Sequence, residues 1–210
     1  MCGRYTLRRA AMVAAAIDAM LQLPELDDFY DASPGRQVPV VRLDDARRVI
    51  DLAKWGFVPV WAKPDQKIPK SVNAKSETVA TNGMFRSAFK SSRCLLPADG
   101  FYEPKGPKTM KNRPQFYFHR PDHAMFAMAG VWSHTDAGNT FALITTTPNK
   151  LMAPIHDRMP VILDRAAYES WLNPNTPVDA LQRLLRPAPD ADLIFEAVTP
   201  QMHEELGLFD

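Results

Sequence analysis

Proline is the residue type that most restricts how this chain can fold, because 19 of its 210 residues are proline whereas only 9 are glycine. A proline removes a backbone N–H donor, so helices and central strands end or bend where it occurs. This content favours short helices and short strands. With 46% hydrophobic and 23% charged residues, the sequence is typical of a folded globular chain. Its length corresponds to one domain, or at most to two small ones.

The first half of the chain shows four local patterns: an amphipathic helix at 9–22, a β-hairpin of 38–42 with 47–53, an aromatic stretch at 55–61 and a helix at 77–89. Apolar residues spaced three and four apart predict the two helices, and Phe85 and Phe89 are one such pair. Asp44 and Asp45 lie at the expected turn of the hairpin. Pro59 argues against a central strand in the aromatic stretch.

The second half of the chain consists mainly of short apolar runs separated by Gly, Pro, Asp and Asn. These runs predict strands at 94–97, 116–119, 125–132, 141–147, 161–163 and 193–198, with helices at about 164–173 and 177–186. Several successive strands without alternating helices favour an antiparallel or mixed sheet. The predicted fold is α+β, a single domain over 1–210 whose barrel-like, mostly antiparallel or mixed sheet is flanked by several helices.

The sequence gives no support for a membrane, secreted or metal-bound protein. It has no run of ~18 apolar residues, and its first residues lack the apolar core of a secretory signal. The cytoplasm is therefore the expected compartment. Cys2 and Cys94 lie in no Cys-x-x-Cys and beside no paired histidines, which disfavours a zinc site or a disulfide framework. We expect a monomer with no metal and no organic cofactor.

Charge is distributed unevenly along a chain whose formal net charge is only +1. Residues 54–120 contain 13 Lys and Arg against four Asp and Glu, a net charge of +9, whereas residues 164–210 have a net charge of −6. Such a basic segment can form an electropositive face that attracts a phosphate backbone. The alternative is a solvated lysine-rich surface with no ligand.

Cys2 is the residue at which the sequence departs most from an ordinary globular chain. Aminopeptidases commonly remove a methionine that precedes a small residue, and loss of Met1 would leave a 1,2-aminothiol. Its α-amine has an ordinary pKa of about 7.7–8.0, so it can condense with an aldehyde, after which the thiol closes a thiazolidine. Three interpretations stay open for Cys2: aldehyde capture, amide hydrolysis by an N-terminal nucleophile, and a buried apolar residue behind a retained Met1.

Four short polar insertions in apolar context could supply the groups that such a nucleophile needs: 72–74, 100–103, 145–149 and 155–158. Glu103 follows two aromatic residues, so burial could raise its pKa, although a strand-end carboxylate is the simpler interpretation. His156 with Asp157 could transfer a proton or could stabilise a turn. Asn73 could bind an oxyanion or cap the following helix.

Six segments in order resemble one family: MCGRY at 1–5, WGFVP at 55–59, NAKSET at 73–78, CLLPADGFYE at 94–103, AGVW at 129–132 and IHDRMPVIL at 155–163. Over roughly residues 2–175 the chain is similar to the SOS response-associated peptidase (SRAP) family. The resemblance implies a protein that recognises abasic sites in single-stranded DNA, including single-strand/double-strand junctions, and crosslinks to the opened deoxyribose through its processed N-terminal cysteine. It also implies autocatalytic cleavage after Met1, lyase chemistry at abasic sites, and association with the nucleoid when DNA is bound.

The resemblance implies roles for nine residues of this chain. Cys2 is expected to be the crosslinking nucleophile, Asn73 to hold the sugar or the amine, Glu103 to act as acid and base, and His156 to polarise the sugar hydroxyl. The expected DNA contacts are phosphate contacts by Arg4, Lys75 and Arg158 and a stacking wedge formed by Trp61 and Phe85.

The chain departs from the family pattern at several positions near these residues. The family more often has arginine where Lys75 stands, and a lysine contacts phosphate as a point charge without the bidentate fork. Asp31, Arg36 and Pro104 are further departures. Two other functions stay open at this point: an N-terminal-cysteine amidohydrolase unrelated to DNA, and a non-covalent binder of single-stranded nucleic acid.

Overall fold

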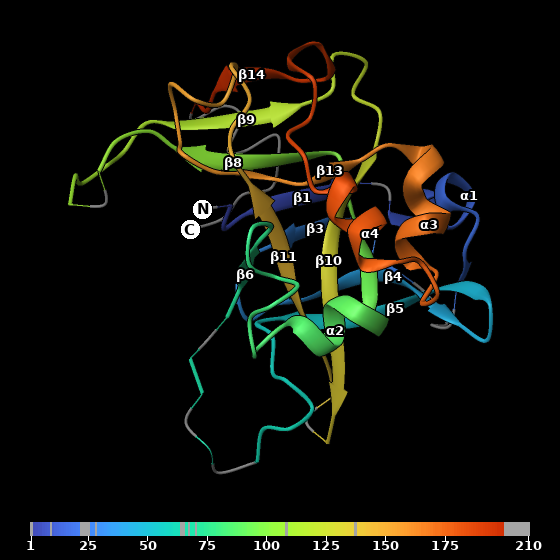
Figure 1. Ribbon diagram of the computed structural model, residues 1–210. Helices are drawn as coiled ribbons and strands as arrows, with labels where there is room; N and C mark the ends of the chain where they lie inside the picture. Colours follow the sequence, from blue (N-terminus) through green and yellow to red (C-terminus); the bar gives the residue numbers. More distant parts are fainter. Residues whose placement is uncertain are drawn as a thin grey trace.

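Two β-sheets form the centre of the protein (Figure 1). The computed structural model describes residues 2–8, 10–21, 26–27, 29–63, 66, 68–69, 71–107, 109–136 and 138–199. Five strands of the first sheet close into a barrel: β4 (Gln37–Asp44), β5 (Arg47–Trp55), β7 (Arg93–Ala98), β10 (Phe126–Thr135) and β11 (Gly138–Thr146). The neighbours pair antiparallel in the order β11-β10-β7-β4-β5, and a parallel pairing of β11 with β5 closes the ring. The predicted α+β fold with a barrel-like sheet is confirmed.

The β4–β5 hairpin forms where the sequence predicts it. Its two turn residues, Asp45 and Ala46, both have positive φ, of 42° and 65°. This is the type I′ geometry whose twist matches that of the flanking strands. Four short strands extend the same sheet: β2 (Met20–Leu21), β6 (Asn73–Lys75), β12 (Met159–Pro160) and β13 (Ile162–Leu163).

The second sheet is antiparallel throughout and has the order β14-β9-β8-β1-β3. Its strands are β1 (Tyr5–Arg8), β3 (Phe29–Ala32), β8 (Gly100–Pro104), β9 (Gln115–His119) and β14 (Ile194–Ala197). Gly100 is required at the start of β8, because a Cβ atom there would lie 2.1 Å from the ring of Tyr117. Close approach of these two strands positions the end of β8, where Glu103 lies.

The helices are short, as the proline content predicts. They are η1 (Ala10–Met12), α1 (Val13–Ile17), α2 (Arg86–Ser91), η2 (Arg165–Ala167), α3 (Tyr168–Leu172), α4 (Val178–Leu184) and η3 (Asp190–Asp192), the η elements being 3₁₀-helices. Among the described residues, none of these helices is long and apolar enough to span a membrane.

Two expected helices are shorter than predicted. The helix expected at 9–22 ends at Asp18, which has a left-handed φ of 52°, and positions 9 and 22 lie outside the described residues. The helix expected at 77–89 begins only at Arg86. The side chain of Asn82 accepts a hydrogen bond from the N–H of Met84 at 2.8 Å, and this local turn competes with helical hydrogen bonding.

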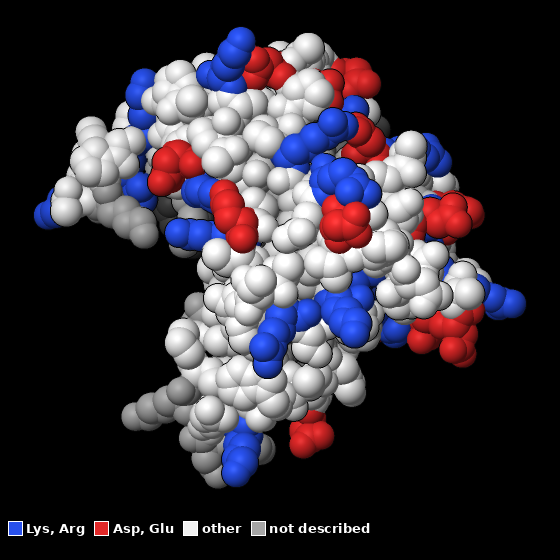
Figure 2. Space-filling view, in the orientation of Figure 1, with Lys and Arg blue, Asp and Glu red and all other residues white. Residues whose placement is uncertain are grey.

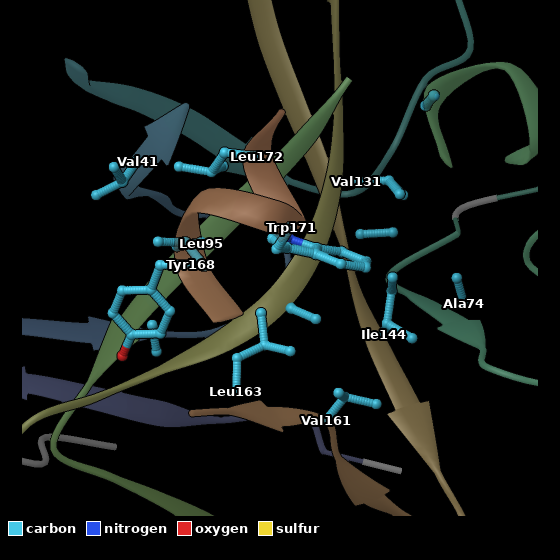
Figure 3. Packing of buried hydrophobic residues seen from close by; sticks show 14 of the residues in the cluster. Val41, Ala74, Leu95, Val131, Ile144, Val161, Leu163, Tyr168, Trp171 and Leu172 are labelled. Atoms are coloured by element: carbon cyan, nitrogen blue, oxygen red, sulfur yellow. The ribbon is translucent and has the colours of Figure 1, made fainter. Parts of the chain in front are cut away.

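Alternate residues of the barrel strands pack into two separate cores. On β7, Leu95 belongs to the core under the helices, whereas Cys94 and Leu96 belong to the core shared with the second sheet. In the first core, Trp171 of α3 lies among side chains of the barrel strands (Figure 3). Its indole N–H donates to the carbonyl oxygen of Cys94 at 2.9 Å. Cys2 belongs to the second core, between the two sheets.

Candidate active site

The pairing of β1 with β8 brings Cys2 and Glu103 together. Tyr5 of β1 lies opposite Phe101 of β8 in an antiparallel pair. Because partners in such a pair run in opposite directions, the residues before Tyr5 lie beside the residues after Phe101. Both Cys2 and Glu103 are fully buried, with 0% exposure. The preceding residue, Met1, lies outside the described residues.

Asn73 reaches the same place from the barrel sheet. It begins β6, which pairs in parallel with β11 so that Asn73 lies opposite Leu143. Its side-chain Nδ2 donates to the carbonyl oxygen of Cys2 at 2.9 Å. Its Oδ1 is buried and accepts no hydrogen bond from the part of the chain that the structure describes. The amide therefore fixes the backbone of Cys2 and keeps one acceptor available.

His156 completes the group from the segment between β11 and β12. Its Nε2 lies 3.9 Å from Oε2 of Glu103. On the other side of the ring, Nδ1 accepts a hydrogen bond from the N–H of Arg158 at 3.0 Å, so the neutral ring has its proton on Nε2, toward Glu103. The carboxylate of Asp157 also lies 2.9 Å from Nδ1 and favours the protonated ring.

These side chains meet at a pocket of about 310 Å³, which is lined by Cys2, Gly3, Val72, Asn73, Pro104, Gly106, Pro107, Arg113 and His156. Its walls thus come from the N-terminal segment, from β6 and from the hairpin between β8 and β9. Figure 2 shows the surface hollowed below that hairpin, on the side where Figure 1 marks the N-terminus. Three of the four predicted catalytic residues, Cys2, Asn73 and His156, line this pocket, and Glu103 is buried beside them, 3.9 Å from His156.

Burial shifts the titration of three of these groups. Burial raises the pKa of Glu103 from its ordinary value of 4.5 to about 7. Burial also raises the pKa of the Cys2 thiol, and the charge of nearby Glu103 raises it further. The pKa of His156 is lowered, chiefly by burial. Near neutral pH the thiol is therefore protonated, the imidazole is neutral, and the carboxyl group is poised between its two forms.

The chemistry available at this pocket is nucleophilic and acid–base. A thiol, a carboxyl group near its own pKa, an imidazole and an amide are the groups that addition to a carbonyl carbon requires. In the described part of the chain, no cluster of three or more His, Cys, Asp or Glu side chains is arranged to hold a metal ion.

The three predicted phosphate contacts differ in availability. Arg4 is held by Asp31 through two hydrogen bonds of 2.9 Å. Arg158 is held by Glu77 through hydrogen bonds of 2.6 and 2.9 Å, which lower the pKa of Glu77 to about 2. Lys75 is exposed and has no ion pair with any described residue. Lys75 is thus the cation of the three that is already available to a phosphate.

The two predicted stacking residues also differ. The side chain of Trp61 is 52% exposed, so its indole is accessible from solvent. Phe85 is only 6% exposed and packs against Phe57, with their ring centroids 5.3 Å apart. The prediction of a wedge that includes Phe85 needs correction, because its ring is part of the core and presents no accessible face. Of the two residues, only Trp61 presents an accessible ring.

Sequence reasoning did not assign Arg113 or Glu77 to the site, and it named Asp31 only as a departure from the family pattern. Arg113 lines the pocket from the hairpin, where no motif marks it, although it contributes to the basic segment. Asp31 and Glu77 neutralise the two arginines that the motifs do mark. For Glu77 the available signal was charge, since it is one of four acidic residues within the basic segment.

Comparison with known proteins gives consistent matches over most of the chain. A family model described as SOS response associated peptidase (SRAP) matches residues 1–205. The chain is 38% identical over 203 residues to Abasic site processing protein YoqW of Bacillus subtilis, covering 91% of this chain and 89% of that protein. It is 29% identical over 182 residues to Abasic site processing protein YedK of Escherichia coli, covering 82% and 79%.

A solved structure also matches the fold. The crystal structure of a protein from Bacteroides thetaiotaomicron superposes with a TM-score of 0.84 at 25% sequence identity, covering 95% of this chain and 93% of that chain. The barrel, the second sheet and the strands that carry the pocket residues all lie within the described residues of this chain.

Proposed function

The chain belongs to the SOS response-associated peptidase family, and from this premise we propose that it processes abasic sites in single-stranded DNA by forming a covalent adduct at Cys2. The relatives YoqW and YedK, both named abasic site processing proteins, support this proposal. The observation that carries it is the convergence of Cys2, Asn73 and His156 on one pocket, with Glu103 buried beside them.

The first step is the release of the α-amine of Cys2. Water must cleave the Met1–Cys2 peptide bond, giving free methionine and an N-terminal cysteine. The amine then attacks the C1′ aldehyde of the ring-opened deoxyribose and forms a carbinolamine, which loses water to give a C=N bond. Protonated Glu103 donates the proton that the departing hydroxyl needs, since its pKa of about 7 leaves much of it protonated at neutral pH.

The second step closes the ring. The sulfur of Cys2 adds to the imine carbon, a C–S bond forms, and the π electron pair moves to nitrogen. Burial raises the pKa of the thiol, so the thiol is protonated and needs a base. The nitrogen of the protonated C=N bond keeps its own proton, and Glu103, now a carboxylate, accepts the thiol proton and so returns to its acid form. The net reaction joins an aldehyde and an aminothiol into a thiazolidine and releases one water.

Asn73 and His156 hold and polarise the reacting groups. The hydrogen bond from Asn73 to the carbonyl oxygen of Cys2 keeps the N-terminal residue in place. The buried Oδ1 of Asn73 can accept a hydrogen bond from the α-amine or from a sugar hydroxyl. His156, neutral near pH 7, polarises the sugar oxygen through its Nε2–H and so assists ring opening and β-elimination.

DNA contacts follow from the charges around the pocket. Lys75, which is exposed, contacts a phosphate directly. Arg158 leaves Glu77 and binds a phosphate oxygen instead. Water can solvate the released carboxylate, because the Glu77 side chain is 47% exposed. Trp61 stacks on an unpaired base, which favours single-stranded DNA over a continuous duplex.

Covalent capture is tested with purified protein whose intact mass shows loss of Met1. The protein is incubated with single-stranded DNA that contains one abasic site and with the same strand lacking it, and the products are separated on denaturing gels. We expect an adduct only with the abasic strand. Cys2→Ala abolishes it, whereas Cys2→Ser leaves at most a reversible imine that borohydride traps.

Cys94→Ala is the matched control, because Cys94 is the second cysteine of the chain, is fully buried and does not line the pocket. It should retain the adduct. Absence of an adduct from protein lacking Met1, together with turnover of an amide substrate, would instead identify an amidohydrolase. Affinity for DNA that is unchanged in Cys2→Ala, without any adduct in the native protein, would identify a non-covalent binder.

A further inference from the structure

A second, larger pocket lies at the opposite end of β1 from Cys2. It has a volume of about 800 Å³ and is lined by Arg8, Met12, Ala16, Ile17, Asp99, Tyr117, Arg120, His123, Ala124, Met125, Phe126, Arg165 and Tyr168. Figure 1 shows α1 and α3, which contribute to it, on the side of the molecule away from the N-terminus. Arg8 lies six positions after Cys2, and extended chain of that length spans roughly 20 Å. The pocket is therefore distinct from the candidate active site.

One end of this pocket is a fixed polar cluster around Asp99. The hydroxyl of Thr6 donates to Oδ1 of Asp99 at 2.6 Å, and the hydroxyl of Tyr117 donates to the same oxygen at 3.1 Å. The other oxygen, Oδ2, accepts a hydrogen bond from the N–H of Arg8. The Arg8 side chain in turn donates to the hydroxyl of Tyr117 at 3.2 Å. Asp99, the one carboxylate among the described residues that line the pocket, is thus already satisfied by the protein.

Two further guanidinium groups face the same pocket without a carboxylate partner. Within the described residues, neither Arg120 nor Arg165 has an Asp or Glu oxygen at ion-pair distance. The Nε of Arg120 is buried and has no hydrogen-bond partner there. A buried donor without a partner is costly unless a ligand satisfies it. With Arg8 partly balanced by Asp99, Arg120 and Arg165 leave the pocket with an excess of about two positive charges.

The remaining wall is apolar and partly aromatic. Met12, Ile17, Met125 and Phe126 supply apolar surface. The exposed ring of His123 lies parallel to that of His119, with centroids 4.5 Å apart and planes inclined by 8°. A pocket of this size with an apolar wall and a few convergent polar groups has the properties of a small-molecule site.

We propose that this pocket binds a phosphate monoester attached to a nucleoside. Planar guanidinium forks match phosphate oxygens in a bidentate manner, and the excess of positive charge suits a dianion. The apolar wall and the His123 ring receive the base and sugar. The same chemistry is offered by a free nucleoside monophosphate and by the 5′-phosphorylated end of a DNA strand. This proposal does not depend on the function proposed for Cys2.

The test is calorimetric titration of the native protein with thymidine 5′-monophosphate, thymidine and inorganic phosphate. The monophosphate should bind about tenfold or more tightly than either fragment. Arg165→Ala, which changes an exposed side chain, and Arg120→Gln should each weaken its binding about tenfold. The matched control is Arg183→Ala, an exposed arginine of α4 that does not line the pocket. Equal binding of monophosphate and thymidine, or equal effects of Arg165→Ala and Arg183→Ala, would overturn the proposal.

Competition distinguishes the two sources of the phosphate. A single-stranded oligonucleotide without an abasic site is added to the monophosphate complex, with and without a 5′-phosphate. If only the phosphorylated strand displaces the monophosphate, and does so at a lower concentration than the monophosphate itself, the ligand is the DNA end. If both strands displace it equally and weakly, the ligand is the free nucleotide. Arg165→Ala should still form the adduct with abasic DNA, so a failure at this pocket is separable from a failure at Cys2.

Discussion

Arg93 and Glu103 lie ten residues apart in the chain, and both are buried, but the regions around them are built differently. The guanidinium of Arg93 donates to four backbone carbonyl oxygens at 2.5–2.6 Å, those of Trp171, Phe89, Lys90 and Asn173. These carbonyls lie at the C-terminal ends of α2 and α3, so Arg93 caps both helices. Burial lowers its pKa only to about 10, and it stays charged at neutral pH.

Glu103 instead has groups near it that can themselves exchange protons. Its charge raises the pKa of the Cys2 thiol, and His156 lies 3.9 Å away. Backbone carbonyls cannot take up or release a proton at these pH values, whereas a thiol and an imidazole can. The difference teaches that burial alone does not indicate function: a buried charge enclosed by backbone acceptors is structural, and a buried carboxyl group beside a nucleophile is available for chemistry.

The largest effect on the fold is expected from Arg93→Met. This change leaves four buried carbonyl oxygens without their donor and should lower the free energy of unfolding by about 3–5 kcal/mol. Urea unfolding followed by tryptophan fluorescence measures it. The folded fraction should form the adduct at the native rate. A loss below about 1 kcal/mol would mean that the helix ends do not depend on Arg93.

The pH dependence of stability sharpens the comparison at Glu103. Because the folded state raises the pKa of Glu103 from 4.5 to about 7, the native protein binds its proton more tightly than the unfolded chain does. Stability contributed by this group is present below pH 4.5 and is lost as the pH rises toward 7, on the order of 3 kcal/mol in total. The unfolding curves of native protein and Glu103→Gln should therefore diverge over this window. Parallel curves from pH 4 to 8 would contradict the shifted pKa.

Glu103→Gln should also slow adduct formation about 100-fold, because an amide cannot transfer the protons that ring closure requires. Single-turnover rates on abasic single-stranded DNA measure the effect. The native rate should change with pH around 7, the pKa of Glu103, and this change should disappear in the variant. DNA affinity should stay the same, which separates loss of chemistry from loss of binding. An unchanged rate would remove Glu103 from the mechanism.

The smallest effects are expected at Lys75 and at the ion pair of Arg158 with Glu77, in which the carboxylate is the more exposed partner. Glu77→Gln frees Arg158 and should tighten binding to single-stranded DNA only about two- to fivefold at low salt, since ion pairs at the protein surface contribute little.

Lys75→Ala should reduce the slope of log affinity against log salt by about one. Fluorescence anisotropy across a salt series measures both. A slope unchanged in Lys75→Ala would show that this lysine contacts no phosphate.

Much of the fold could be predicted from local patterns, and the exceptions have physical causes. The β4–β5 hairpin and the strands at β7, β9, β10 and β11 follow from short apolar runs between turn residues. The sequence predicts a barrel-like sheet but does not identify the pair of strands that closes it, because the parallel pairing of β11 with β5 joins segments far apart in the chain. The helix expected at 77–89 is shortened by an Asn82 side chain that competes locally with the helix.

The candidate site shows the same division. Motif order singled out Cys2, Asn73, Glu103 and His156; three of them line one pocket, and Glu103 is buried beside it. Burial of Phe85 could not be predicted, because helical spacing with Phe89 fits a core position as well as a stacking position. Pairing of Arg158 with Glu77 depends on a contact across 81 residues of chain. Sequence reasoning thus anticipated which buried groups lie close together better than it anticipated the surface contacts around them.

The most direct measurement is peptide mass mapping of the product formed with abasic single-stranded DNA. A covalent sugar remnant should be found on the peptide that begins with Cys2, with Met1 absent and one water lost on joining, and it should persist without a reducing agent. A remnant on a lysine, or an adduct on chains that still carry Met1, would contradict the mechanism.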